Sequence, residues 1–489
     1  MPNNVPIWEI ITLVFMLNLV LAVVLVLFER HNPIVTLVWL MVIFFIPIIG
    51  FILYLFLGQD LRKRKLFKLK GKEEDSIIRA TRYQYAMIYG NQYKFKDPLV
   101  QKYADVIRLN LMSSEASFTQ DNKVKILPTG KEKFQNLLDN IRKAQQYIYL
   151  EYYIIRNDDL GIKIRDLLTA KAREGIIVKV LYDGMGCRKL SKKFFQPLIN
   201  AGGKIAEFYP PFIPYINLRV NYRNHRKICI IDGNTGYIGG FNIGNEYLGL
   251  SKKFGFWRDI HLRINGSAVK DLEFRFILDW RFASGEETPF SFKKVHFSKH
   301  LSDGDSGDTA IQIVSGGPDS KWHTIRNSYL KIINNARHHV YLETPYFIPD
   351  NDLLSALKIA ALSGVDVRLI IPLKEDHPFV HWASLSYIGE LLEAGIKAYT
   401  YHRGFIHSKM ITADGFISSV GTANLDIRSL YTNFEINAFI YSSEVAEELD
   451  RLFLQDIEDS TEITLEIYNK RSIVVKIKES VCRLLSPLL

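Results

Sequence analysis

Two long stretches without a charged residue open the chain. They cover residues 10–28 and 34–57 and are 19 and 24 residues long. Each is long enough to cross the roughly 30 Å hydrocarbon core of a bilayer as an α-helix. The segment between them, residues 29–33, carries charges and ends in a proline, which indicates a turn outside the hydrocarbon. This pattern predicts a two-helix transmembrane hairpin over residues 1–60.

The charges around these stretches predict an orientation. A cleaved signal peptide is the main alternative for the first stretch, but residues 1–9 contain no Lys or Arg to form its positive n-region. Seven Lys and Arg lie in residues 62–72, against a single one, Arg30, in the turn. Because positive residues favour the cytoplasmic side, we expect a multi-pass protein of the cell membrane whose remaining chain is cytoplasmic. Residues 61–120 are then a polybasic juxtamembrane linker that contacts anionic membrane lipids.

Past residue 120 the pattern of apolar and polar positions repeats itself. The segment 148–151 (IYLE) returns as 340–343 (VYLE), and 175–181 (GIIVKVL) returns as 364–370 (GVDVRLI). The offsets between these copies are 192 and 189 residues. A period held this closely is the sequence signature of a duplicated structural unit.

Each copy has the alternation of an α/β domain. Residues 176–181 and 367–371 are short β-branched runs typical of buried strands, whereas 160–174 and 351–363 have the spacing of helices. We therefore predict two duplicated domains, each a mixed sheet flanked by helices. The predicted boundaries are 121–297 for the first domain, 298–310 for a linker rich in Ser, Asp and Gly, and 311–489 for the second domain with its C-terminal helix.

Composition narrows the class of protein. With 489 residues, 48% of them hydrophobic and 23% charged, the chain is a folded protein rather than a disordered one. A net charge of +10 suits an anionic partner, but the polybasic segment holds most of it, and residues 73–489 keep only +5. That modest charge argues against nucleic acid as the partner. Three widely spaced cysteines suggest a reducing compartment and no structural metal, and nothing in the sequence indicates an oligomeric state.

Both copies contain the pattern H-x-K-x-x-x-x-D. It comprises His225, Lys227 and Asp232 in the first copy and His407, Lys409 and Asp414 in the second. In each copy a glycine follows 14 residues after the histidine and an asparagine 17 residues after it, at Gly239 and Asn242 and at Gly421 and Asn424. Because side chains alternate along a strand, the histidine and lysine of each motif share one face. An imidazole beside an ammonium group is suited to handling a phosphate.

These motifs, followed by GGFN after the first and GTANLDIRSL after the second, resemble the signature of the phospholipase D superfamily. The apolar hairpin, the NHRKI context and the WRDIH run at 257–261 resemble the bacterial cardiolipin synthases in particular. The resemblance implies that the two halves surround one pseudo-symmetric site. It also implies catalysis without a metal or other cofactor, through a phosphohistidine intermediate.

The chemistry of phosphodiester transfer agrees with this residue set. It requires a nucleophile, an acid for the leaving alkoxide and positive charge on the non-bridging oxygens. We expect His225 to be the nucleophile and His407 the general acid, although near-identical halves leave the reverse order open. Lys227 and Lys409 would hold the phosphoryl oxygens.

The sequence leaves two roles open for each of the other polar residues. Asn242 and Asn424 could bind substrate or stabilise turns. Asp232 and Asp414, the last members of the two motifs, lie on the opposite face by parity, and each precedes a glycine as in a tight turn. A structural role is therefore at least as plausible as a catalytic one. Asp259 and Glu435, on later apolar runs, are better candidates to orient the imidazoles.

The expected reaction joins two phosphatidylglycerol molecules into cardiolipin and releases glycerol. The alternatives are a phospholipase D-type hydrolase, a phosphatidyltransferase with another alcohol acceptor, a nuclease of the superfamily, and a non-catalytic membrane scaffold. Two further segments bear on lipid access. The aromatic, proline-rich insertion 209–222 could meet acyl chains or pack on the surface, and 471–489 could form an interfacial helix or dock on the second domain.

Overall fold

The computed structural model describes residues 7–28, 33–46, 50, 54, 67, 71–209, 222–288 and 307–486. The chain divides into two compact units. One contains residues 1–65 together with 210–222, and the other contains 66–209 and 223–489. The predicted insertion at 209–222 and the predicted linker at 298–310 fall mostly outside the described residues.

The first unit contains two apolar helices. Helix α1 covers Ile7–Phe28 and α2 covers Pro33–Phe45, where the chain bends. The amide of Asn18 donates a hydrogen bond to the carbonyl oxygen of Ile43, 3.3 Å away, and so ties the two helices together. The expected second helix extends to residue 57, and most of that extension lies outside the described residues. Within the described ranges, none of the helices combines the length and apolar character needed to cross a bilayer.

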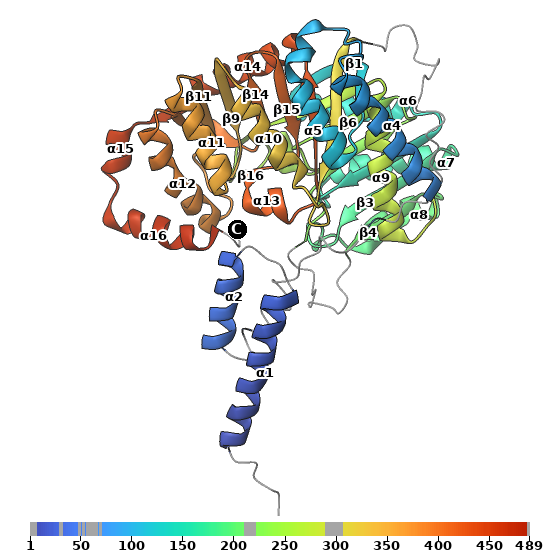
Figure 1. The fold of residues 1–489 in the computed structure, drawn as a ribbon. Coiled ribbons are helices and arrows are strands. Elements are labelled where there is room, and N and C mark those ends of the chain that lie inside the picture. Colours follow the sequence, from blue (N-terminus) through green and yellow to red (C-terminus); the bar gives the residue numbers. More distant parts are fainter. Residues whose placement is uncertain are drawn as a thin grey trace, which may run out of the picture. The chain divides into compact units, whose positions relative to one another are not determined.

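The second unit is built on one continuous sheet of sixteen strands (Figure 1). From one edge the order is β18, β12, β11, β9, β14, β15, β17, β8, β1, β7, β6, β5, β2, β3, β4, and β13 pairs with β7 beside this path. The first half supplies β1 (Phe118–Thr129), β2 (Tyr147–Tyr152), β3 (Ile177–Asp183), β4 (Lys204–Phe208), β5 (Lys227–Ile231), β6 (Thr235–Gly239) and β7 (Phe256–Asn265). The second half supplies β8 (Thr309–Gly316), β9 (His339–Glu343), β11 (Asp366–Pro372), β12 (Lys397–Tyr401), β13 (Gly404–Ile406), β14 (Met410–Ala413), β15 (Ile417–Gly421), β17 (Glu435–Tyr441) and β18 (Ser460–Ile463).

The expected duplication of mixed α/β halves is confirmed, with one difference. Strands β2, β3 and β4 are parallel to one another, as are β9, β11 and β12, and antiparallel strands complete each half. The two sheets are not separate, because β1 of the first half pairs antiparallel with β8 of the second. A short two-stranded sheet, β10 (Phe347–Ile348) with β16 (Leu425–Asp426), lies apart from the main one.

Helices cover both faces of each half in the same arrangement. In the first half, Tyr149 of β2 stacks on Phe276 of α9, whereas its neighbours Ile148 and Leu150 point to the opposite face and join the core beneath α6 and α7. These helices are α6 (Gly130–Lys143), α7 (Asp159–Arg173), α8 (Gln196–Asn200) and α9 (Ala268–Ser284). Helix α6 begins at a capping box, where Thr129 Oγ1 accepts a hydrogen bond from the backbone N–H of Glu132.

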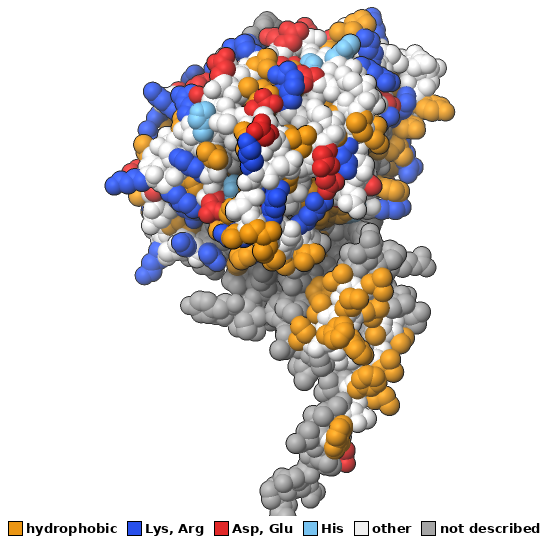
Figure 2. Space-filling model, turned by 90° about the vertical axis from the view of Figure 1, so that its left-hand side faces the viewer, with side chains coloured by type: hydrophobic (Ala, Val, Ile, Leu, Met, Phe, Trp, Pro, Cys, Tyr) orange, Lys and Arg blue, Asp and Glu red, His pale blue; other side chains and the backbone are white. Residues whose placement is uncertain are grey.

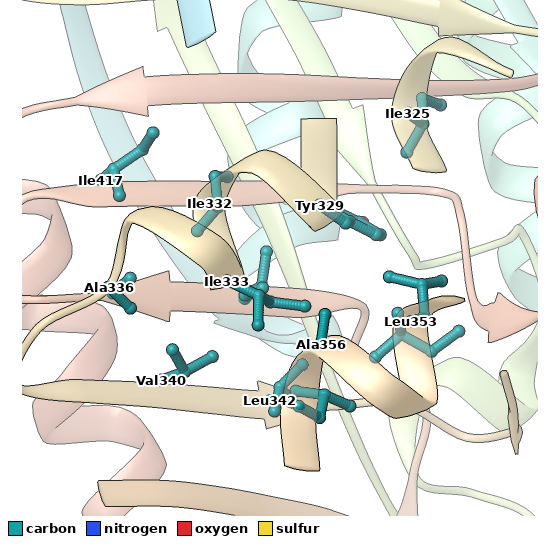
Figure 3. Packing of buried hydrophobic residues seen from close by; sticks show 14 of the residues in the cluster. Ile325, Tyr329, Ile332, Ile333, Ala336, Val340, Leu342, Leu353, Ala356 and Ile417 are labelled. Carbon is teal, nitrogen blue, oxygen red and sulfur yellow. The ribbon is translucent and has the colours of Figure 1, made fainter. Parts of the chain in front are cut away.

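The second half repeats this packing. Tyr341 of β9 stacks on Phe453 of α14, and Val340 and Leu342 face the other way, toward α10 and α11 (Figure 3). The helices here are α10 (Thr324–Asn335), α11 (Asn351–Leu362), α12 (Pro378–Glu393), α13 (Ile427–Tyr431), α14 (Ser443–Glu458), α15 (Leu465–Asn469) and α16 (Ile473–Leu484).

The predicted juxtamembrane linker is largely a packed part of the second unit. It contains α4 (Gly71–Tyr89), a 3-10 turn at Pro98–Tyr103 and α5 (Ala104–Ser114). Val106, Ile107 and Leu111 of α5 are buried in the core of the second half. Apolar residues at helical spacing thus favour packing over a solvated linker.

Candidate active site

The two histidine motifs meet because the backbone beside each histidine pairs with the other half, through strand β13 in one direction and an isolated bridge between Asn224 and Phe434 in the other. The backbone N–H of His225 donates to the carbonyl oxygen of Phe434 at 2.9 Å, next to Glu435 in the second half. The corresponding N–H of His407 donates to the carbonyl oxygen of Arg258 at 2.7 Å, next to Asp259 in the first half. Strand β13, which leads to His407, pairs in parallel with β7, which carries Asp259. Each imidazole is therefore placed beside an acidic residue of the opposite half.

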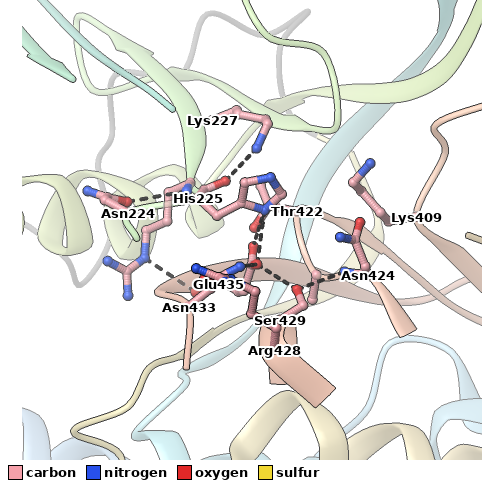
Figure 4. A network of polar contacts seen from close by, with 12 residues as sticks. Asn224, His225, Lys227, Lys409, Thr422, Asn424, Arg428, Ser429, Asn433 and Glu435 are labelled. Carbon is pink, nitrogen blue, oxygen red and sulfur yellow. Dashed lines mark hydrogen bonds and ion pairs between the residues drawn. The ribbon is translucent and has the colours of Figure 1, made fainter. Parts of the chain in front are cut away.

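His225 is held by Glu435 (Figure 4). Its Nδ1 lies 2.9 Å from Oε1 and 3.0 Å from Oε2 of the carboxylate, which is 1% exposed. Ser429 donates its hydroxyl to Oε1 at 2.6 Å, and Asn433 donates its amide at 3.3 Å. Burial opposes the charged carboxylate, but His225, Lys227 and Ser429 outweigh it and lower the pKa of Glu435. An ionised Glu435 fixes the Nδ1–H tautomer and leaves Nε2 with its lone pair.

His407 is held in the same way by Asp259. The distance from its Nδ1 to Oδ2 is 2.8 Å, and the backbone N–H of Ile260 donates to Oδ1 at 2.8 Å. Burial raises the pKa of Asp259 to about 6. A Cβ on Gly240 would lie 2.0 Å from Oδ1 of Asp259, so the carboxylate occupies space that only glycine leaves.

Both imidazoles line one cavity of about 510 Å³. The wall combines aromatic rings with arginines and amides from both halves, and includes Tyr153, Arg223, Trp257, Tyr346, Arg428 and Asn433. Tyr153 packs edge-on against His225 with ring centroids 4.9 Å apart, and Trp257 lies 5.3 Å from His407. A single phosphoryl group in this cavity would face both histidines.

The two lysines of the motifs lie directly behind the histidines. Lys227 Nζ donates to the carbonyl oxygen of His225 at 2.6 Å. Lys409 Nζ lies 2.7 Å from Nδ1 and 3.2 Å from Nε2 of His407, and also donates to the His407 carbonyl oxygen. Burial lowers the pKa of Lys227 to about 7 and that of Lys409 to about 8.

Burial is also the main reason why the pKa of each histidine lies below its usual value. For His407 the like charges of Lys409 and Lys227 lower the pKa further, whereas for His225 Glu435 partly restores it. A bound phosphodiester anion would oppose these effects and favour the protonated imidazole. These shifts favour neutral imidazoles without substrate, and the negative charge of a bound phosphodiester would raise their pKa and favour proton uptake from solvent.

Asn242 and Asn424 both line the cavity. The side-chain oxygen of Asn242 accepts from the backbone N–H of Ile154, and its amide donates to the Tyr247 hydroxyl. The amide of Asn424 donates to Asp426 at 3.0 Å, but its Oδ1 is buried without a hydrogen-bond partner among the described residues.

The motif aspartates hold turns instead. Asp232 accepts hydrogen bonds from the backbone N–H groups of Gln145, Gln146 and Tyr147, and its φ is +52°. Asp414 accepts from residues 337, 338 and 339 in the same way, with φ +53°. Among the described residues, neither belongs to the cavity wall. The geometry supports the structural alternative, because three donors from a strand start converge on each carboxylate.

A buried cluster behind each motif was not predicted from the sequence. Arg226 lies 2.8 Å from Asp279, with Glu151 beside them, and Arg258 lies 2.7 Å from Asp456, with Glu343 beside them. Burial raises the pKa of Glu343 to about 8 and that of Glu151 well above its usual value. The signal was present, since both glutamates interrupt apolar strands at equivalent positions of the repeat.

Comparisons with known proteins agree with this geometry. The family model described as "Cardiolipin synthase, PLD-like domain" matches residues 137–256 and 329–457, one segment in each half. A second model, "Phospholipase_D-nuclease N-terminal", matches residues 16–59. A solved structure, the phosphatidylserine synthase of Haemophilus influenzae Rd KW20, shares the fold with a TM-score of 0.60 at 16% identity, covering 79% of this chain and 100% of that one. The duplicated fold with two H-x-K motifs on one cavity is that of the phospholipase D superfamily.

Curated relatives narrow the class further. The chain is 48% identical over 480 residues to the major cardiolipin synthase ClsA of Bacillus subtilis (strain 168), covering 98% of this chain and 99% of that protein. It is 49% identical, over the same shares, to a cardiolipin synthase of Listeria monocytogenes serotype 4b (strain CLIP80459). The chain therefore belongs to the cardiolipin synthase family with phospholipase D-like domains.

Proposed function

We propose that the protein is a phosphatidyltransferase that converts two phosphatidylglycerol molecules into cardiolipin and glycerol. The observation that carries the proposal is the placement of two imidazoles on one cavity, each hydrogen-bonded to a carboxylate of the other half. The family membership supports the choice of lipid substrate.

The reaction proceeds in two steps. Nε2 of His225 attacks the phosphorus of the first phosphatidylglycerol, the P–O bond to the headgroup glycerol breaks, and protonated His407 gives that alkoxide its proton. Glu435 stabilises the positive charge that develops on the His225 ring, and the lysine ammonium groups offset charge on the phosphoryl oxygens. Neutral His407 then takes a proton from the headgroup hydroxyl of the second phosphatidylglycerol. The oxygen of that hydroxyl attacks the phosphorus of the phosphohistidine, the P–N bond to His225 breaks, and cardiolipin is formed.

The pKa values of the two orienting acids support the choice of His225 as nucleophile. The pKa of Glu435 is lowered and that of Asp259 is raised to about 6, so the firmer negative charge lies beside His225. A phosphohistidine carries positive charge on its ring and gains most from that partner. Asp232 and Asp414 act in this scheme only by holding the turns.

Incubation of the purified full-length protein with phosphatidylglycerol as the sole lipid tests the reaction. Cardiolipin and glycerol in equal amounts are the expected products, identified by mass spectrometry. Phosphatidic acid as the only lipid product would instead establish a hydrolase. Rapid acid-free quenching with phosphatidylglycerol labelled in its phosphatidyl group should trap the label on His225 of the wild type. The His225→Ala variant should carry no label.

The membrane placement is a further part of the proposal. Residues 10–28 and 34–57 form a transmembrane hairpin. The second unit, which contains the active-site cavity and is called the catalytic unit below, lies on the cytoplasmic side, because seven positive residues follow the second stretch. Single cysteines introduced at Asn4 and Asn32 test the orientation. A membrane-impermeant reagent applied to intact cells should modify Asn32→Cys and leave Asn4→Cys unmodified, and the reverse result would overturn the orientation.

A further inference from the structure

The C-terminal helix α16 is attached to the catalytic unit through polar side chains. Arg483 donates to the carbonyl oxygen of Ser386 at 3.2 Å and pairs with Glu390, both on α12. Glu479, 4% exposed, pairs with Arg471 at 3.1 Å. Tyr387 of α12 also donates its hydroxyl to Ser486 at 3.1 Å, and Cys482 is buried in the core of the second half. Ordinary surface helices anchor through apolar residues, and α16 does so mainly through charged ones.

Its outward side is apolar. Ile473, Ile477, Val481 and Leu484 are spaced along one stripe of the helix, and they are 70%, 57%, 52% and 81% exposed. Val474, 57% exposed, widens the stripe. Figure 2 shows hydrophobic side chains gathered along the lower edge of the catalytic unit, beside lysines and arginines. A contiguous apolar surface of this kind marks an interaction site in a folded protein.

Basic residues accompany the apolar stripe. Residues 465–486 contain five Lys and Arg against two Glu. Lys470, Lys476 and Lys478 are exposed, whereas Arg471 and Arg483 are turned toward the protein. An apolar stripe bordered by lysines is complementary to an anionic bilayer surface, where the lysines reach the phosphates and the apolar side chains the acyl region. A second copy of this chain would bring the same positive charges together.

The helix is also connected to the active-site cavity. Helix α16 packs along α12, and the start of α12 forms part of the cavity wall through His377 and Val380. Phe379, between these two residues, is 61% exposed. The outward stripe and the cavity are thus joined by a single helix of 16 residues.

We propose that α16 lies in the interfacial layer of an anionic bilayer, with Ile473, Ile477, Val481 and Leu484 among the acyl chains, and so positions the cavity for lipid entry. This inference rests on the proposed function, because it assigns the surface through which the lipid substrate is reached. It assigns a membrane contact to the unit that contains the cavity, in addition to the proposed N-terminal hairpin.

A site-specific label separates this contact from anchoring by the N-terminal helices. The full-length protein carrying Ile477→Cys is labelled with an environment-sensitive nitrobenzoxadiazole group, while the three native cysteines are buried. It is reconstituted into vesicles of phosphatidylglycerol and phosphatidylcholine, with and without lipids that bear a nitroxide on the upper acyl chain. The matched control carries the label at Leu362→Cys on α11, which is 73% exposed.

The label at position 477 should shift its emission to the blue and lose about half of its intensity to the nitroxide lipids, and the label at 362 should do neither. Absence of quenching at 477 would overturn the proposal. A blue shift without quenching would mean that protein covers the stripe, and it would overturn the proposal too. Dependence of that shift on protein concentration would then identify a second copy as the cover.

Kinetics provide an independent readout. The double variant Ile477→Ser with Val481→Ser should raise the KM for vesicle-embedded phosphatidylglycerol about tenfold, since less apolar surface enters the bilayer. Its kcat/KM for a short-chain phosphatidylglycerol dissolved as monomers should be unchanged, as should that of Leu362→Ser on vesicles. Equal losses on both substrates would contradict the docking role. If neither lipid yields cardiolipin with the wild type while the label is quenched, the proposed function fails and the docking surface stands.

Discussion

Oε1 of Glu435 lies 2.9 Å from Nδ1 of His225, although 210 residues separate them in the chain. The pseudo-symmetric contact joins His407 to Asp259, 148 residues apart, at 2.8 Å. Each half thus contributes one motif histidine to the cavity and one carboxylate to the histidine of the other half. Neither half holds a complete site by itself, which explains why the duplicated unit works as a pair.

Replacement of the orienting acids should separate the two chemical steps. In Glu435→Gln the ring of His225 loses the negative charge that stabilises its phosphorylated form, and the rate of covalent intermediate formation should fall about 10³-fold. In Asp259→Asn the rate of phosphatidyl transfer to the second phosphatidylglycerol should fall as well as the rate of intermediate formation, because His407 serves both steps. Single-turnover kinetics with labelled phosphatidylglycerol measure both rates. If Asp259→Asn slowed only intermediate formation and Glu435→Gln slowed both steps, His407 would be the nucleophile.

The motif aspartates should affect stability rather than chemistry. Asp232→Ala removes the acceptor for three backbone N–H groups and places alanine at a positive φ, so the free energy of unfolding should drop by about 2 kcal/mol. Asp414→Ala should behave alike. Asparagine tolerates this conformation, so Asp232→Asn should lose less. Thermal unfolding in detergent gives the stability, and turnover per folded molecule should stay within about twofold of wild type. A large loss of turnover in a fully folded Asp232→Asn variant would argue for a catalytic aspartate.

Glu343 should make stability depend on pH. Burial raises its pKa to about 8 in the folded protein from an ordinary value of 4.5, so the folded state retains a proton that the unfolded chain loses. Its contribution is complete below about pH 4.5 and is lost as pH rises toward 8. The Glu343→Gln variant cannot ionise, so between pH 5 and pH 8 its unfolding temperature should decline less than that of the wild type. Parallel curves for the two proteins would refute a buried, protonated Glu343.

The pair Arg258 and Asp456 should bind the two halves together. Both side chains are almost fully buried at 2.7 Å, and they come from β7 of the first half and α14 of the second. Arg258→Met leaves Asp456 buried without its cation and should cost about 3–5 kcal/mol of unfolding free energy. Adding Asp456→Leu should restore much of that loss, as a double-mutant cycle would show. The exposed pair Arg142 and Asp139 serves as the control, and its disruption should change stability by less than about 1 kcal/mol.

The sequence alone determined the features that depend on local periodicity. Strand alternation placed His225 with Lys227 and His407 with Lys409, and the repeat established two α/β halves with matched motifs. The turn position of Asp232 and Asp414 could also be anticipated from parity and the following glycine.

Only the tertiary structure decided how the halves combine. The pairing of β1 with β8, which merges two expected sheets into one, and the crossing that gives Glu435 to His225 and Asp259 to His407 join segments some 150 to 210 residues apart. No local pattern encodes such pairings, because they depend on which strand edges and apolar faces remain to be satisfied once each half has formed. For the same reason, only the structure shows that α5 packs into the core and that α16 turns its apolar side chains outward.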